Sequence, residues 1–174
     1  MDAFTRAARI KFIAFDIDGV MTDGSLIYTA EGTELKTFNV QDGQGVKLAQ
    51  RAGIDLAIVT GRTSPALEAR AADLGITHLY QGVTNKRDML GKLLERQGLG
   101  WPAVAYMGDD LMDLSAMTRC GMAIAPSTAH AQVKARSHLV TQLGGGKGAV
   151  REAIEFILAA QGKLDGLFAS YLED

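Results

Sequence analysis

Residues 13–19 decide the fold, and they read Ile13-Ala14-Phe15-Asp16-Ile17-Asp18-Gly19. The apolar residues predict a buried strand, which ends in two carboxylates spaced two positions apart. Because successive side chains of a strand point to opposite sides, we expect Asp16 and Asp18 to lie on one side and Ile17 on the other. Two carboxylates this close repel each other unless a cation lies between them. The spacing therefore predicts a metal-supported site with one carboxylate free for chemistry.

Strand-like and helical patterns alternate along the rest of the chain. Strands are expected at residues 10–15, 54–59, 78–80, 103–107 and 122–124, and helices at residues 45–52, 65–74, 86–97, 111–119, 129–135 and 149–160. Residues 26–30 and 33–38 alternate in polarity around Glu31-Gly32, which is typical of a β-hairpin. Such alternation predicts an α/β fold with a doubly wound, mostly parallel sheet. No repeat or linker is evident, so we expect a single domain over residues 1–174.

Composition narrows the class of protein. The 174 residues suffice for one domain with a sizeable core. The net charge is -2 and no block of like charge occurs, which argues against nucleic acid or a membrane surface as the main partner. A single cysteine, Cys120, excludes a disulfide framework and a cysteine-based zinc site. No apolar run approaches the roughly 20 residues of a spanning helix, and residues 1–11 do not resemble a signal peptide. We therefore expect a cytoplasmic protein.

Polar residues follow four of the expected strands. Ligands bind beyond the carboxyl ends of parallel strands, so these residues are expected to share one rim of the sheet. In chain order they are Asp16 and Asp18; Thr60, Gly61 and Arg62; Lys86, at the start of a helix; and Asp109, Asp110 and Asp113. Carboxylate oxygens suit Mg²⁺, while cations and hydrogen-bond donors neutralise phosphoryl oxygens. The rim therefore predicts a site for Mg²⁺ and a phosphoryl group.

This ordered set resembles the haloacid dehalogenase (HAD) superfamily of phosphatases over residues 10–160. Within it, the chain is similar to the phosphatases of 3-deoxy-D-manno-octulosonate 8-phosphate (KDO 8-phosphate). The closer similarity lies in residues 19–24, the hairpin, residues 38–43 and the glycine-rich residues 145–152. The resemblance implies a Rossmann-like sheet of the HAD type, with a small β-hairpin insertion at about residues 24–38 in place of a cap domain.

The resemblance also implies roles for the rim residues. Asp16 is expected to be the nucleophile that forms an aspartyl-phosphate, and Asp18 the general acid and then the general base. Mg²⁺ is expected on the Asp16 and Asp109 side chains and the Asp18 backbone carbonyl. The phosphoryl oxygens are expected on Thr60, the Gly61 amide and Lys86. Asp110 and Asp113 stay open: either could orient a water near the metal, and either could cap the helix that follows.

The expected substrate carries a sugar-acid carboxylate besides its phosphate. Arginine suits a carboxylate because its planar fork matches the two oxygens. Arg62, beside the phosphate-binding loop, and Arg70, two helical turns further on, are the leading candidates, and Lys147 and Arg151 are further ones. The ordinary alternative for each of them is a solvated surface position.

A hairpin is too small to cover the site. The resemblance implies that neighbouring subunits close it in a homotetramer built around the hairpins. The C-terminal tail, about residues 161–174, carries an amphipathic stripe of Leu164, Leu167, Phe168, Tyr171 and Leu172. This tail either packs on its own core or, as the resemblance implies, covers a neighbour's site.

The leading hypothesis is a Mg²⁺-dependent phosphatase of KDO 8-phosphate, which would place the enzyme in lipopolysaccharide precursor synthesis. A rival substrate is the 9-phosphate of a nine-carbon sugar acid. A second hypothesis is a non-catalytic assembly module, which the intact catalytic positions argue against. A third is a phosphorylated receiver domain. That class carries its phospho-accepting aspartate on a middle strand, whereas Asp16 and Asp18 both follow the first strand here.

Overall fold

The structure, a computed structural model, describes residues 1–173. Asp174, which ends the expected domain and the expected tail, lies outside the described residues. A six-stranded sheet forms the centre, in the order β5-β4-β1-β6-β7-β8, and its neighbouring strands all pair in parallel. The strands are β1 (Phe12–Phe15), β4 (Asp55–Val59), β5 (His78–Tyr80), β6 (Val104–Met107), β7 (Met122–Ala125) and β8 (Leu139–Val140). The predicted α/β fold is confirmed; β8, with two residues, is too short to have shown a pattern.

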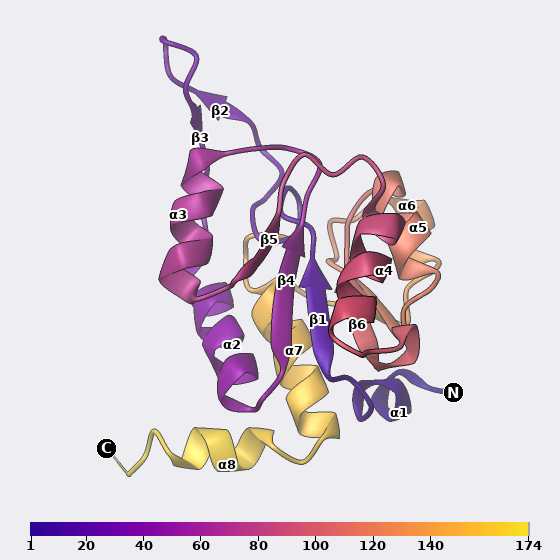
Figure 1. The fold of residues 1–174 in the computed structure, drawn as a ribbon. Helices are drawn as coiled ribbons and strands as arrows, with labels where there is room; N and C mark the ends of the chain where they lie inside the picture. The colour runs from indigo at the N-terminus through magenta and orange to yellow at the C-terminus, as the bar shows by residue number, and fades with distance from the viewer. Residues whose placement is uncertain (174) are drawn as a thin grey trace.

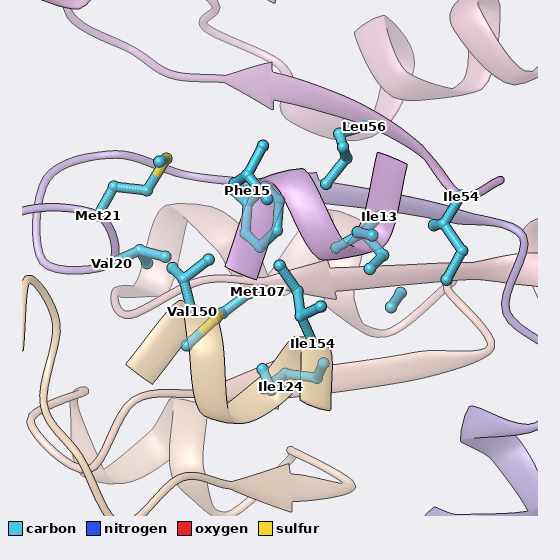
Figure 2. Packing of buried hydrophobic residues seen from close by; sticks show 14 of the residues in the cluster. Ile13, Phe15, Val20, Met21, Ile54, Leu56, Met107, Ile124, Val150 and Ile154 are labelled. Carbon is cyan, nitrogen blue, oxygen red and sulfur yellow. The ribbon is translucent and has the colours of Figure 1, made fainter. Parts of the chain in front are cut away.

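Helices cover both faces of the sheet (Figure 1). One face carries α1 (Ala3–Ala7), α2 (Val40–Arg51), α3 (Pro65–Leu74) and α7 (Ala149–Ala160), and the other carries α4 (Lys86–Arg96), α5 (Leu114–Met117) and α6 (Ala131–Lys134). All four residues of β1 are buried, and they alternate between the faces as strand geometry requires. Ile13 and Phe15 pack toward Val150 and Ile154 of α7, as Figure 2 shows.

Helix α2 begins at Val40, five residues before the predicted start. Glycine disfavours helices by about 1 kcal/mol relative to alanine, and Gly43 and Gly45 both lie in the first half of α2. Tertiary packing overrides this preference. A Cβ on Gly45 would lie 2.8 Å from the Arg151 Cα, so glycine is what lets α2 approach α7. The Asn39 side chain caps the helix by accepting a hydrogen bond from the Gln41 amide at 2.7 Å.

Other predicted elements shift by smaller amounts. The predicted helix at residues 111–119 is a 3-10 turn, η2 (Leu111–Asp113), followed by the short α5. The predicted helix at residues 129–135 is reduced to α6, and α1 and a 3-10 turn, η1 (Trp101–Ala103), were not expected. Of the helices in residues 1–173, none reaches the length and apolarity that a bilayer crossing requires.

The predicted hairpin is present as β2 (Ile27–Tyr28) paired antiparallel with β3 (Glu34–Leu35). It projects from the end of the molecule at which the parallel strands finish (Figure 1). The tail helix α8 (Leu164–Ala169) lies at the opposite end, and its Leu164 and Leu167 pack on the core. Within its own chain the tail is thus far from the rim of the sheet.

Candidate active site

The carboxyl ends of β1, β4 and β6 and the start of α4 surround a pocket of about 300 Å³. The predicted residues that line it are Asp16, Asp18, Thr60, Gly61, Arg62, Lys86 and Asp109, joined by Asp110 and Asp113. They come together because each follows a strand, or begins a helix, at the same edge of one parallel sheet. Thr60 is buried at the end of β4, and Gly61 is exposed beside it.

Lys86 lies between two carboxylates at the base of this pocket. Its Nζ is 2.7 Å from Asp16 Oδ2 and 2.7 Å from Asp113 Oδ1, and its side chain is 4% exposed. Burial opposes the charge of Lys86, but the two carboxylates outweigh it and raise its pKa. Lys86 is therefore a fixed cation directed at Asp16.

Asp113 is buried, and both of its carboxylate oxygens accept hydrogen bonds. Its Oδ1 accepts hydrogen bonds from Lys86 and from the Tyr106 hydroxyl at 2.9 Å, and its Oδ2 accepts from the backbone amides of Asp109 at 3.0 Å and Asp110 at 3.2 Å. Asp110 caps η2 through the Leu111 amide. Asp110 and Asp113 both take part in the cap of η2, and Asp113 also fixes Lys86 and the loop that carries Asp109.

The carboxylates of Asp16 and Asp109 are buried with too little positive charge nearby to offset that burial. Burial, followed by the charge of Asp113, raises the pKa of Asp16 despite the nearby Lys86. Burial, together with the charges of Asp113 and Asp16, raises the pKa of Asp109 to about 7. Carboxylates crowded in this way favour either a proton or a metal ion between them.

The donor set fits a magnesium ion. Oxygens of Asp16, Asp109 and Asp113 lie within 4.8 Å of one another. Asp113 has both oxygens occupied, whereas Asp16 Oδ1 is buried and accepts no hydrogen bond from the described residues 1–173. Hard oxygen ligands suit Mg²⁺. Asp16 and Asp109 are therefore the carboxylates with an oxygen to offer.

Gly19 makes room for this arrangement. A Cβ at this position would lie 2.0 Å from Asp109 Oδ2, and the backbone has a φ of +85°. Only a residue without a side chain lets the Asp109 carboxylate approach the loop after β1 so closely.

Asp18 contacts two cations. Lys36, which follows β3 in the hairpin, donates to Asp18 Oδ1 at 2.5 Å, and Arg62 Nε lies 3.6 Å from Asp18 Oδ2. Arg62 also pairs with Glu34 of the hairpin. Lys36 and Glu34 are functional candidates that the strand-end pattern missed, because they lie on the insertion and not at the rim.

The structure does not bring Arg70 into the pocket of its own chain. Arg70 is not among the described residues that line that pocket. Its guanidinium pairs with Asp73 at 2.7 Å, donates to the Asn39 carbonyl at 3.3 Å and lies over the Phe38 ring. A substrate-binding role for Arg70 therefore stays a prediction that needs a ligand reaching it from elsewhere.

The glycine-rich stretch at residues 144–148 has a supporting role. A Cβ on Gly145 would lie 1.8 Å from the Gly19 carbonyl oxygen, so this stretch packs directly behind the loop after β1. Asp42, buried in α2, accepts hydrogen bonds from the amides of Gly148 at 3.3 Å and Arg151 at 3.0 Å, at the start of α7. Lys147 is exposed and lies 4.0 Å from Asp23, while Arg151 pairs with Glu155.

Comparisons with known proteins find relatives along most of the chain. A family model described as haloacid dehalogenase-like hydrolase matches residues 74–154. The 3-deoxy-D-manno-octulosonate 8-phosphate phosphatase KdsC of Yersinia pestis is 46% identical over 165 residues, which cover 95% of this chain and 88% of that protein.

Solved structures extend the similarity to the whole fold. The 3-deoxy-D-manno-octulosonate 8-phosphate phosphatase of Moraxella catarrhalis, solved with magnesium ion, phosphate ion and KDO, matches with a TM-score of 0.95 and 43% identity over 97% of each chain. The cobalt-bound phosphatase of Haemophilus influenzae matches with a TM-score of 0.90 and 40% identity, over 94% of this chain and 99% of that one.

Proposed function

This chain belongs to the 3-deoxy-D-manno-octulosonate 8-phosphate phosphatases, a family of haloacid dehalogenase-like hydrolases, and from that premise we propose how its site works. It is a Mg²⁺-dependent phosphoric monoester hydrolase that converts KDO 8-phosphate into KDO and phosphate. The observation that carries the mechanism is the state of Asp16, which is buried, pairs through one oxygen with Lys86 and has a second oxygen that accepts no hydrogen bond from residues 1–173. A carboxylate in this state can serve as a nucleophile beside a cation.

In the first step, a carboxylate oxygen of Asp16 attacks phosphorus and the bond from phosphorus to the sugar oxygen breaks. Asp18 gives its proton to the departing oxygen, so the sugar leaves as an alcohol. Lys86, Thr60 and the Gly61 amide hold the phosphoryl oxygens. The product of this step is an aspartyl-phosphate on Asp16.

In the second step, water attacks the same phosphorus atom and the bond to Asp16 breaks. Asp18, now ionised, takes the proton from that water, which returns both aspartates to their starting states. Asp113 keeps Lys86 in place throughout, because each of its oxygens is already fixed by donors. Inorganic phosphate then leaves.

The metal ion would be held by the side chains of Asp16 and Asp109 and the backbone carbonyl of Asp18. When bound, Mg²⁺ supplies positive charge that neutralises the phosphoryl oxygens. The raised pKa values of Asp16 and Asp109 support this assignment, because a cation relieves the crowding that causes them.

We propose that Arg62 binds the carboxylate of the sugar acid, since it lines the pocket and is partly exposed. Arg70 would meet the substrate only through an arrangement of subunits. A homotetramer whose hairpins pack together would supply one. The hairpin exposes Leu26, Ile27, Tyr28 and Leu35, and an isolated two-stranded hairpin is marginal in water. Light scattering would measure the oligomer size.

We also propose the domain organisation, the role of the tail and the cellular location of the protein. Residues 1–174 would form one domain, with the hairpin inserted at about residues 24–38 and a tail from about residue 161. The tail would cover a neighbour's site, because in its own chain it lies at the far end. A cytoplasmic location fits the buried, unpaired Cys120, and the substrate places the enzyme in lipopolysaccharide precursor synthesis.

Phosphate release from KDO 8-phosphate tests the function, beside other sugar phosphates that include the 9-phosphate of a nine-carbon sugar acid. We expect turnover that prefers KDO 8-phosphate, stops with EDTA and is lost in Asp16→Asn. Faster turnover of the nine-carbon 9-phosphate would support the phosphatase mechanism but contradict KDO 8-phosphate as the preferred substrate. Absence of turnover by folded protein with Mg²⁺ would favour an assembly module.

A further inference from the structure

Four alternating charges form a closed ring at the mouth of the pocket. Lys36 contacts Asp18 at 2.5 Å and Glu34 at 3.0 Å, and Arg62 contacts the same two carboxylates from the other side. Asp18 and Arg62 line the pocket, whereas Lys36 and Glu34 come from the hairpin. The insertion therefore reaches the proposed acid and base of the reaction.

The burial of Lys36 is unusual. Its side chain is 3% exposed, although lysine is almost never fully buried unless it is paired. Burying an ammonium group is costly unless hydrogen bonds to opposite charges compensate. Asp18 accepts a hydrogen bond from Lys36 and Glu34 adds an ion pair at 3.0 Å, so the Lys36 ammonium has a defined position in the fold.

The contact distinguishes the two oxygens of Asp18. Lys36 donates to Oδ1 within hydrogen-bond distance, while the nearest atom of Arg62 lies 3.6 Å from Oδ2, beyond a good hydrogen bond. Oδ1 can accept this bond whether or not Oδ2 carries a proton. The ring thus leaves Oδ2 as the oxygen that exchanges a proton with the substrate.

We propose that Lys36 is a positioning residue for Asp18, through which the hairpin takes part in proton transfer to the leaving group. This inference rests on the proposed function. Lys36 fixes the orientation of the Asp18 carboxyl group, and it neither donates nor accepts the transferred proton. Glu34 holds Lys36 and Arg62 on opposite sides of Asp18.

The first test compares two leaving groups. The sugar alcohol of KDO 8-phosphate needs a proton as it leaves, whereas the p-nitrophenolate of p-nitrophenyl phosphate leaves without one. Because a general acid contributes about 10²–10⁴-fold, we expect Lys36→Met to lower kcat/KM for KDO 8-phosphate by at least about 10-fold and for p-nitrophenyl phosphate much less. Lys36→Arg should restore part of the loss. Lys92→Met, an exposed lysine on α4, is the matched control.

The second test separates positioning from binding. In an Asp16→Asn background, which does not turn over, calorimetry measures the affinity for KDO 8-phosphate with and without Lys36→Met. We expect equal affinities. Equal kinetic losses on both substrates, or a loss of affinity that matches the kinetic loss, would show that Lys36 only supports the hairpin and would overturn the inference. An inactive wild-type enzyme would instead overturn the proposed function, and the inference with it.

Discussion

Replacing Gly19 with alanine should disable the site while leaving the fold intact. The new Cβ would lie 2.0 Å from Asp109 Oδ2 and 2.5 Å from its Cγ, whereas Cβ atoms essentially never approach other atoms within 3.0 Å. The carboxylate must therefore retreat by about 1 Å. It can do so by rotating its own side chain, so the cost falls on the proposed metal site and not on the core.

Two effects contribute to the outcome, and a control separates them. The φ of +85° at Gly19 strains any other residue by about 1–2 kcal/mol. Gly53→Ala introduces a similar strain at a φ of +77°, with no atom within 4 Å of the new Cβ. Both variants should lose similar stability in urea titrations. A misplacement of 1 Å can cost about 10²-fold in rate, and we expect such a loss in Gly19→Ala alone.

The assays are phosphate release from KDO 8-phosphate over a range of Mg²⁺ concentrations, and the rise in Tm that Mg²⁺ causes. Gly19→Ala should need more Mg²⁺ for half-maximal activity and should show a smaller rise in Tm than Gly53→Ala. The reasoning is refuted if the two variants share the same Mg²⁺ dependence and kcat/KM, because the contact with Asp109 would then be irrelevant to catalysis.

Three further predictions concern the buried charges. In EDTA, the free energy of unfolding should fall as the pH rises from 3.8 toward about 7. The pKa of Asp109 is about 7 in the folded chain and about 3.8 in the unfolded chain, so the folded state binds more protons in this range. Saturating Mg²⁺ should remove this slope, and a flat urea-denaturation profile in EDTA would contradict the assignment. Lys86→Met should leave Asp16 and Asp113 without their cation. Urea titration should show a loss of about 3–5 kcal/mol in the free energy of unfolding, and phosphate release should show a kcat lower by at least about 10²-fold. Near-normal turnover would contradict this prediction. Asp42→Ala should lower the free energy of unfolding by about 1–3 kcal/mol, because one buried and one partly buried amide at the start of α7 lose their acceptor. An unchanged urea midpoint would argue against this cap.

Sequence reasoning located the rim residues because each follows a strand. Hydrophobic runs marked β1, β4 and β6, and the rule that parallel strands end together turned three separate motifs into one site. Asp16, Thr60 and Asp109 lie in the pocket for that reason. The helices at residues 65–74 and 149–160 were also located to the residue, because a local apolar period and their end residues mark them.

The partners of these residues could not be predicted in the same way. Asp113 was left open between a helix cap and a place near the metal, because its contacts with Lys86 and Tyr106 depend on how α4 packs on the sheet. The start of α2 at Val40 was missed, and the close approach of α7 at Gly45 is a tertiary contact that the sequence does not show. Lys36 and Asp42 showed no periodic signal at all, because a buried polar residue is recognised by its partners and not by its neighbours in the chain.

The amino-acid sequence by itself determined most of the strands and helices, the edge of the sheet at which the polar residues lie and the family to which the chain belongs. These depend on local patterns of apolar residues and on short motifs. The tertiary structure alone decided which carboxylates hold Lys86, which oxygen of Asp16 accepts no hydrogen bond from residues 1–173 and how the hairpin reaches Asp18. The contacts of Lys36 with Asp18 and of Lys86 with Asp113 join residues that are 18 and 27 positions apart in the chain. Such charges come close together only when the core packs, and they interact more strongly where water is excluded.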